Sequence, residues 1–256
     1  MPASKVAIVG HRGARKLWPE NSLDGFRRTR ELGVDGVEFD VHVARDGELV
    51  VIHDPTLERT TEGTGAVAER TAAELAATPL RGMGGGGAGG AGVPTLDQAL
   101  DVFAGTVIEL HIEIKTSAGG RLYDGLERRL LDLIARRGLQ DRAILTCFVP
   151  KALETVRRLS PRQRILASVD RRAAEEGGGL AATLDRLVAI DSCLVAVEKD
   201  LLAETFDLCL SRLGSDRLGV WVLNEPDELA AWLARPIRQI TTDRPDVALR
   251  VRKRAG

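Results

Sequence analysis

From about residue 94 onward, the chain alternates between short apolar runs and longer amphipathic segments, and this alternation limits the fold more than any other feature. Each apolar run has the length and composition of a buried strand, and each following segment has the residue spacing of a helix. In the segment 121–137, for example, one helical stripe collects Leu122, Leu126, Leu130, Leu133 and Ile134. This alternation predicts a parallel sheet whose strands are joined by helices.

Two earlier runs bring the number of expected strands to eight, each followed by a helix. The expected strands are residues 6–10, 36–43, 107–115, 143–147, 164–169, 193–197, 218–223 and 237–242. Eight such units in 256 residues fit a closed (β/α)8 TIM barrel better than an open doubly wound sheet. An open sheet that binds a dinucleotide needs a glycine-rich turn after its first strand, and the chain has His11-Arg12-Gly13-Ala14-Arg15 there instead.

The alternation predicts that residues 1–256 form a single domain with a short insertion at residues 56–92. Within the insertion, only residues 71–77 have the pattern of a helix. Residues 82–92 are almost entirely glycine and alanine, which predicts a flexible connector. A phosphate-binding glycine loop would need a preceding strand and a Lys-Ser/Thr ending, and this segment has neither.

Composition excludes several classes of function. The formal net charge is −1 and no long run of one sign occurs, so we expect no nucleic-acid partner. No apolar run is long enough for a secretory signal or a transmembrane helix. The three scattered cysteines favour a reducing compartment over a disulfide framework or a zinc site. These features predict a cytoplasmic protein that acts on a small molecule.

Polar residues gather where the predicted strands end. Strand periodicity puts Glu38, Asp40 and His42 on one face of the second strand, and Glu113 and Lys115 on one face of the third. In a (β/α)8 barrel, functional groups lie at the carboxyl ends of the strands and in the loops that follow them. The other polar or aromatic residues expected there are His11, Arg12, His53, Trp221, Asn224 and Asp243.

The three acids on the second and third strands would repel one another unless a cation lay between them. Oxygen ligands from Glu38, Asp40 and Glu113 favour Mg²⁺ or Ca²⁺ over zinc, and the residues do not decide between these two. The acids could instead form a structural ion-pair network with Arg12 and Lys115. Three acids against two bases leave that network unbalanced, so we favour metal ligation.

The basic residues and the histidines then indicate what the metal acts on. Arg12 and Lys115 would place positive charge beside the metal, and this combination suits a phosphate, because a metal and basic side chains can bind its oxygens together. His11 and His53 come from different strands and would provide a base and an acid near neutral pH. This set predicts metal-assisted cleavage of a phosphate ester.

The same motifs, in the same order along almost the whole chain, resemble those of the glycerophosphodiester phosphodiesterases. The motifs are His11-Arg12-Gly13 with Pro19-Glu20-Asn21, Glu38-Phe39-Asp40-Val41 with Asp46-Gly47 and His53-Asp54, Pro94-Thr95-Leu96, Glu113-Ile114-Lys115, Trp221 to Asn224, and Thr242-Asp243-Arg244-Pro245. The resemblance implies a TIM-barrel hydrolase that releases glycerol-3-phosphate from an alcohol. The family's characteristic insertion would correspond to residues 56–92.

The resemblance also implies roles for individual residues. It implies that Glu38, Asp40 and Glu113 bind the metal. It also implies that His11 and His53 are the general acid and base, and that Arg12 and Lys115 bind the phosphate. The glycerol 2-hydroxyl would attack phosphorus, and water would then open the cyclic phosphate. Two alternatives stay open: a lysophospholipase D-like phosphodiesterase on the same site, and a non-catalytic barrel that binds phosphate.

Other residues have more modest expected roles. We expect Trp221 to wall the glycerol pocket, and His42, His111 and Cys147 to be core residues. Asp243 is interpreted as a structural residue that caps a turn or helix start. Asn21 is either a helix cap or a substrate contact, and Asp54 an orienting partner or turn residue. Glu20 is a candidate for orienting one of the histidines.

Overall fold

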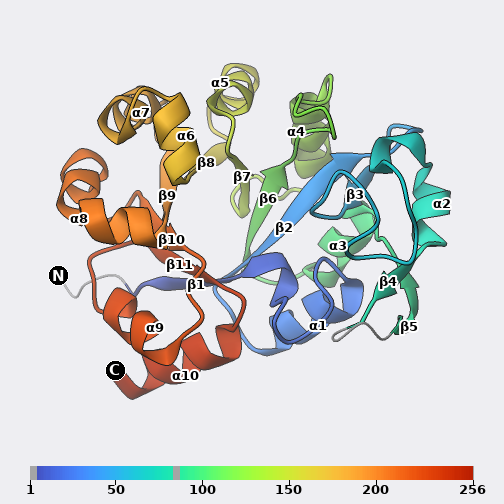
Figure 1. The fold of residues 1–256 in the computed structure, drawn as a ribbon, viewed down its shortest axis with the longest axis horizontal. Helices are drawn as coiled ribbons and strands as arrows, with labels where there is room; N and C mark the ends of the chain where they lie inside the picture. The colour runs from blue at the N-terminus through green and yellow to red at the C-terminus, as the bar shows by residue number, and fades with distance from the viewer. Residues whose placement is uncertain (1–4, 83–86, 256) are drawn as a thin grey trace.

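The computed structural model describes residues 5–82 and 87–255, and within them eight parallel strands form a barrel surrounded by helices (Figure 1). The strands are β1 (Ala7–Gly10), β2 (Gly36–Val43), β6 (Glu109–Ile114), β7 (Ala143–Cys147), β8 (Arg164–Val169), β9 (Leu194–Glu198), β10 (Leu218–Trp221) and β11 (Gln239–Thr242). They are hydrogen-bonded in the order β1-β11-β10-β9-β8-β7-β6-β2, and pairing of β1 with β2 closes the ring. The predicted (β/α)8 fold is confirmed.

Helices cover the outside of this ring. They are α1 (Leu23–Glu31), α3 (Leu96–Val102), α4 (Leu126–Arg136), α5 (Pro150–Leu159), α6 (Arg171–Glu176), α7 (Leu180–Val188), α8 (Lys199–Leu213), α9 (Pro226–Leu233) and α10 (Pro245–Ala255). Local chemistry explains several of the helix starts, since Ser22 caps α1 and Thr95 forms a capping box with Gln98 at α3. The short helix α6, capped by Asp170, was not predicted. Among the described residues, none of the helices combines the length and apolarity that crossing a bilayer requires.

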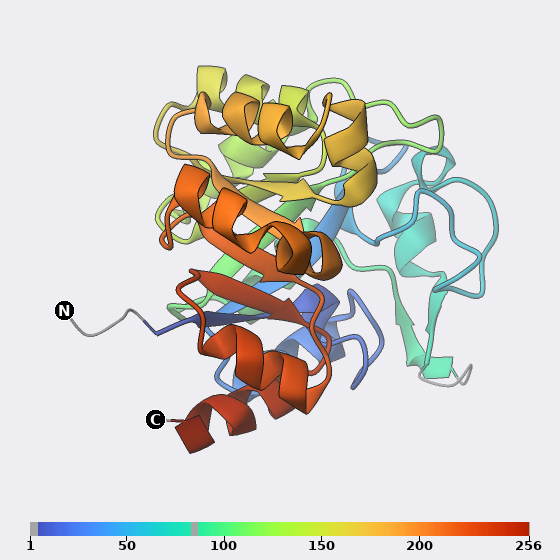
Figure 2. The same cartoon turned by 60° about the vertical axis from the view of Figure 1, so that its left-hand side comes forward.

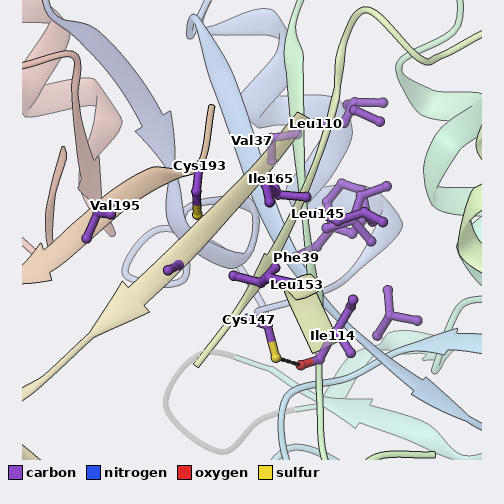
Figure 3. Close-up of a cluster of buried hydrophobic side chains, with 14 of the residues drawn as sticks. Val37, Phe39, Leu110, Ile114, Leu145, Cys147, Leu153, Ile165, Cys193 and Val195 are labelled. Atoms are coloured by element: carbon purple, nitrogen blue, oxygen red, sulfur yellow. Dashed lines mark hydrogen bonds between the residues drawn. The ribbon is translucent and has the colours of Figure 1, made fainter. Parts of the chain in front are cut away.

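The main core lies between the strands and the helices. On β2, Val37 and Phe39 point outward and are fully buried. Figure 3 shows part of this core, where side chains of neighbouring strands pack with Leu153 of α5. Cys147 lies in the same cluster and its thiol donates to the carbonyl of Ile114 at 3.3 Å, so its expected place in the core is confirmed. Each large side chain buried in this way contributes roughly 1.5–3 kcal/mol to folding.

The inward face of the barrel is divided into an apolar part and a polar part. Ile144, Leu166 and Ala196 form an apolar cluster on β7, β8 and β9, with Trp221 packed against it. The inward positions of β2 and β6 carry acidic residues instead. Strand periodicity explains the difference, because the outward residues of all these strands are apolar while the inward residues vary from strand to strand.

The insertion lies to one side of the barrel (Figures 1 and 2). It follows the short strand β3 (Leu49–Val51), which pairs antiparallel with β2, and contains a 3₁₀ turn (Val67–Glu69), α2 (Ala72–Ala76), β4 (Pro79–Arg81) and β5 (Gly87–Gly92). It has a small core of its own beneath α2. The buried residues of that core are Ala44, Val50, Ile52, Leu57, Val67, Ala72, Leu75, Leu80 and Val93.

The prediction of a flexible connector at residues 82–92 was wrong for its second half, which forms strand β5. Antiparallel pairing with β4 uses only backbone groups, so a strand can form without large side chains. Gly92 also lies so close to the Ala76 backbone that a Cβ atom would be 1.9 Å from the Ala76 oxygen. Residues 83–86 of the expected connector lie outside the described part of the chain.

Candidate active site

Three acidic side chains meet inside the carboxyl end of the barrel. Asp40 of β2 lies directly opposite Glu113 of β6, and Glu38 is one inward position earlier on β2. One carboxylate oxygen from each of the three lies within 4.8 Å of the other two. Asp40 is 1% exposed and Glu38 is 7% exposed, so little solvent separates these charges.

The electrostatics of this cluster favour a bound cation. Burial, followed by the charges of Asp40 and Glu113, raises the pKa of Glu38 well above its ordinary value. Burial and the charge of Asp40 also raise the pKa of Glu113, despite a neighbouring lysine. One oxygen of Glu38, Oε1, is buried and has no hydrogen-bond partner in the described residues. A hard divalent cation would satisfy that oxygen and remove the repulsion, so the donor set fits such an ion.

Two basic side chains flank the acids. Lys115 Nζ lies 2.7 Å from Glu113 Oε1 and 3.4 Å from Asp40 Oδ1, and Arg12 Nε lies 3.3 Å from Asp40 Oδ2. Burial alone would raise the pKa of Asp40, but Lys115 and Arg12 outweigh it and hold that pKa below its ordinary range. The backbone amide of Arg12 donates to Glu38 Oε2 at 3.0 Å from a left-handed conformation, with φ of 49°. A non-glycine residue adopts this conformation only where its surroundings enforce it.

His11 is oriented by the last strand of the barrel. Its Nδ1 lies 2.6 Å from Asp243 Oδ1, and Asp243 also accepts hydrogen bonds from Arg15 and Asn224. The pKa of Asp243 is lowered because hydrogen bonds from His11 and Arg15 outweigh the effect of burial. An ionised carboxylate only accepts, so Nδ1 carries the proton and Nε2 keeps its lone pair. Nε2 lies 3.9 Å from Glu38 Oε2 and therefore faces the acidic cluster.

His53 has a similar arrangement at the end of β3. Its Nδ1 lies 2.6 Å from Asp54 Oδ1, and the pKa of Asp54 is lowered to about 2 because the Arg59 and His53 hydrogen bonds outweigh burial. Arg59, from the insertion, donates to both Asp54 and Glu20, and Glu20 accepts from Arg12. Burial lowers the pKa of His53, as it does that of His11, which favours the neutral form of each ring.

The two histidines expected in the core differ from each other. His42 is buried and bonded on both sides: Nδ1 lies 2.8 Å from Tyr123 Oη, and Nε2 lies 3.0 Å from the His53 carbonyl oxygen. Burial lowers the pKa of His42 to about 4, so the ring is neutral and supports the backbone of His53. His111 is also buried, but its Nε2 has no hydrogen-bond partner in the described residues.

A cavity of about 280 Å³ joins these groups. Of the eight residues predicted to form the site, seven line the cavity, namely His11, Arg12, Glu38, His53, Glu113, Lys115 and Trp221. Asp40 lies behind them, almost fully buried, but keeps its place in the acidic cluster. Trp221 donates to the Ala196 carbonyl at 3.1 Å and packs edge-on against Phe148, so its ring forms an apolar wall.

Other expectations need correction. Asn21 is neither a helix cap nor on the cavity wall, because Ser22 caps α1 while the Asn21 amide donates to Asp40 Oδ2 at 2.8 Å. Glu20 holds two arginines rather than a histidine. Asp243 is more than a structural residue, since it hydrogen-bonds a predicted catalytic histidine.

The sequence contained a signal for Asp243. It follows Gln239 and Thr241 at steps of two along the last strand, and both of these face the cavity. The same inward position at the carboxyl end of a barrel strand had identified the other site residues. Arg59 had no such signal, because it belongs to an irregular segment.

The chain resembles known proteins over most of its length. A sequence model described as the glycerophosphoryl diester phosphodiesterase family matches residues 11–247. A glycerophosphodiester phosphodiesterase of Caldanaerobacter subterraneus subsp. tengcongensis is 36% identical over 161 residues, which are 63% of this chain and 65% of that protein. The chain therefore matches less than two thirds of the length of this relative.

Solved structures agree with the sequence match. A crystal structure from Agrobacterium tumefaciens str. C58, assigned to the same family, has a TM-score of 0.88 at 25% identity and covers 98% of this chain and 99% of its own. An Oleispira antarctica phosphodiesterase in complex with the product sn-glycerol-3-phosphate shares the fold, with a TM-score of 0.79 at 21% identity and 96% coverage of each chain. Because the family match extends through the barrel from the end of β1 to the start of α10, the chain belongs to the glycerophosphoryl diester phosphodiesterase family.

Proposed function

We propose that this protein hydrolyses glycerophosphodiesters to glycerol-3-phosphate and an alcohol, using a divalent cation, Mg²⁺ or Ca²⁺. One observation carries the proposal: three clustered acids, two of them buried, and two histidines that are hydrogen-bonded to carboxylates line or adjoin a single cavity. Family membership supports the choice of substrate class. We further propose that residues 1–256 act as one catalytic domain, and that its three free, buried cysteines suit the cytoplasm.

Glu38, Asp40 and Glu113 are the proposed ligands of the cation. When bound, the cation supplies positive charge to the phosphate oxygens. Arg12 and Lys115 lie beside the same acids and are the proposed phosphate-binding residues. With the acids occupied by the cation, both basic groups become available to the substrate. The aromatic ring of Trp221 is the proposed wall for the carbons of glycerol.

The histidines are proposed to move the protons. In the first step, one neutral imidazole removes the proton of the glycerol 2-hydroxyl while its oxygen forms a bond to phosphorus. The bond from phosphorus to the alcohol oxygen breaks, and the other histidine, protonated, donates a proton to that oxygen. In the second step, water opens the cyclic phosphate and the two histidines exchange roles. Asp243 and Asp54 each fix a histidine with its Nδ1 protonated, which leaves Nε2 free for proton transfer.

A panel assay tests the proposal directly. Purified protein is incubated with glycerophosphodiesters of several alcohols, with Mg²⁺ or Ca²⁺ and with EDTA, and glycerol-3-phosphate is measured. We expect metal-dependent release, and at least about a hundredfold loss of kcat in His11→Ala and His53→Ala with nearly unchanged thermal unfolding. The control is Asp246→Asn, an acid of α10 that pairs with Arg244 and Arg250 and does not line the cavity. Absence of hydrolysis with either metal, or full activity in both histidine variants, would refute the proposal.

A further inference from the structure

The backbone of His53 lies beyond the regular part of its strand. β3 ends at Val51, and residues 53–55 form a bend instead of continuing the strand. The pairing of β2 with β3 therefore does not reach His53. Asp54 orients the ring of His53 through Nδ1, but Asp54 is the next residue in the chain and moves with the same backbone. The position of the His53 ring in the barrel thus depends on contacts from other elements.

His42 of β2 supplies such a contact. Its ring is fully buried, and its Nε2 lies 3.0 Å from the His53 carbonyl oxygen. A carbonyl oxygen only accepts hydrogen bonds, so Nε2 of His42 carries the proton and donates. In a neutral imidazole the other nitrogen, Nδ1, is then an acceptor. The contact with His53 therefore determines the tautomer of His42.

Tyr123 bonds to the other side of the same ring. Its hydroxyl oxygen lies 2.8 Å from His42 Nδ1, and the two rings meet edge-on with their centroids 5.7 Å apart. Because Nδ1 accepts, the hydroxyl of Tyr123 is the donor. Burial raises the pKa of Tyr123 to about 12, so the hydroxyl keeps its proton at neutral pH. Two hydrogen bonds, both donated in the same direction, thus run from Tyr123 through His42 to the backbone of His53.

Tyr123 lies in the segment that joins β6 to α4, and Lys115 is the first residue of that segment. Between these two residues the chain folds back on itself, with an antiparallel bridge between Thr116 and Leu122. The segment therefore carries a proposed phosphate-binding residue at its start and the tyrosine just after its fold. The two hydrogen bonds connect this segment with the bend that carries a proposed catalytic histidine.

We propose that Tyr123 is a positioning residue that acts through His42 and sets the place of the His53 ring relative to the bound phosphate. The proposal rests on the proposed role of His53 in proton transfer and adds a residue that works at a distance from the substrate. Among the described residues that line the cavity, neither Tyr123 nor His42 occurs. A remote change that displaces a reacting group by about 1 Å can lower the rate about 100-fold, so a bond at this distance can control turnover.

Tyr123→Phe removes only the hydroxyl and tests the inference directly. With glycerophosphoethanolamine and the divalent cation, we expect kcat to fall about 10-fold or more and KM to change less than about twofold, because the groups that bind the substrate are intact. In a His53→Ala background, Tyr123→Phe should lower kcat no further, since the ring that it positions is absent. The matched control is Thr205→Val, which removes a hydroxyl that donates to the Leu201 carbonyl at 2.6 Å on α8 and does not line the cavity. This control should keep the wild-type kcat.

Variants of His42 show whether the connection passes through its ring. Glutamine can place a donor and an acceptor where the two ring nitrogens lie, so His42→Gln should keep most of the activity. Leucine can do neither, so His42→Leu should lose at least as much activity as Tyr123→Phe. Adding Tyr123→Phe to His42→Leu should have no further effect, because residues that act as one unit are not additive.

The outcomes separate this inference from the proposed function. Wild-type kcat in Tyr123→Phe, or a further loss of the same size when it is added to His53→Ala, would overturn the inference and leave the proposed function intact. If wild-type protein releases no glycerol-3-phosphate, or if His53→Ala is fully active, the proposed function or the role of His53 in it fails instead. Tyr123→Phe loses a single oxygen atom, so the decision does not depend on whether a His42 variant folds.

Discussion

Replacing Glu38 with glutamine should stabilise the protein without metal and remove its response to metal. Burial and two neighbouring acids raise the pKa of Glu38, so the folded state favours the protonated side chain. For a raised pKa, the stabilising contribution is complete below the unfolded value, near 4.5, and is lost as the pH rises through the folded value. Glutamine stays neutral at every pH, so Glu38→Gln should exceed wild-type stability most clearly at pH 8.

The size of the effect follows from the environment of Glu38. One of its two oxygens, Oε1, is buried without a hydrogen-bond partner in the described residues, and an unsatisfied buried acceptor costs about 1–3 kcal/mol. For a chain of this length, 1 kcal/mol shifts the midpoint of thermal unfolding by about 2–4 °C. In EDTA at pH 8, we therefore expect the midpoint of Glu38→Gln to be about 2–12 °C above that of wild type. The difference should shrink as the pH is lowered towards 5.

Metal should reduce or remove this difference in unfolding midpoint. At a metal concentration 100-fold above its dissociation constant, binding adds about 2.7 kcal/mol to wild-type stability. This corresponds to an increase of about 5–11 °C. Glu38→Gln lacks one charged ligand and should gain little. The assay is thermal unfolding in EDTA and over a titration of Mg²⁺ or Ca²⁺.

A matched control separates this effect from a general effect of removing charge. Glu127 on α4 is as buried as Glu38, each with 7% of its surface exposed, but it is outside the acidic cluster. Glu127→Gln should retain the wild-type response to metal. A Glu38→Gln protein that is less stable than wild type in EDTA, or that gains as much from metal, would refute the electrostatic reasoning.

The acids and the histidine partners make further predictions. The affinity of the wild-type protein for metal, measured by calorimetry, should rise with pH above 4.5, and binding should release protons. The reason is that Glu38, whose pKa is raised, must lose a proton before it can bind the metal. A metal affinity that does not change with pH would contradict this. Asp243→Asn should lower kcat by about 10²-fold or more and shift the pH profile, since His11 loses the carboxylate that fixes its tautomer; an unchanged profile would assign Asp243 a purely structural role. Arg59→Met should lower kcat about 10-fold because Asp54 loses its hydrogen bonds from Arg59. Thermal unfolding of the same variant is the control for a general loss of stability. Either His11→Ala or His53→Ala lacks the general acid, and that variant should recover activity when the leaving group is p-nitrophenol, which needs no proton to leave. If each variant loses as much activity on the p-nitrophenyl substrate as on the natural one, separate acid and base roles are contradicted.

The inward-facing polar residues at strand ends were predictable from the sequence, but their hydrogen-bond partners were predictable only in part. Strand periodicity determines which side chains of β2 and β6 face inward, and the parallel register then brings Asp40 opposite Glu113. By contrast, the hydrogen bond between His11 and Asp243 joins residues 232 positions apart and depends on closure of the barrel by β1 and β11. Closure was expected, but the rotamers that bring the two side chains together were not.

The insertion was less predictable because its structure depends on contacts rather than on local pattern. Strand β5 consists of glycine and alanine and has no periodic signal, yet it pairs with β4 through backbone hydrogen bonds. Arg59 lies in a turn, where side-chain direction does not follow from sequence spacing. It reaches Glu20 only because the insertion folds back towards the barrel mouth. A regular helix or strand can be predicted from its sequence pattern, whereas the conformation of an irregular segment depends on tertiary contacts that the pattern does not specify.

The division of the barrel interior suits the proposed substrate, which has a charged phosphate and an apolar carbon chain in its glycerol. Acids and bases face inward from β2, β6 and the turn after β1, while Leu166, Ala196 and Trp221 face inward from β8, β9 and β10. An apolar wall of this kind lowers the local dielectric constant, so each charge opposite to it acts more strongly on a bound phosphate than it would in water. The same wall offers the glycerol carbons a surface from which water is displaced. Replacing Leu166 with a polar residue should therefore weaken both phosphate binding and turnover, although its side chain carries no charge and takes no part in proton transfer.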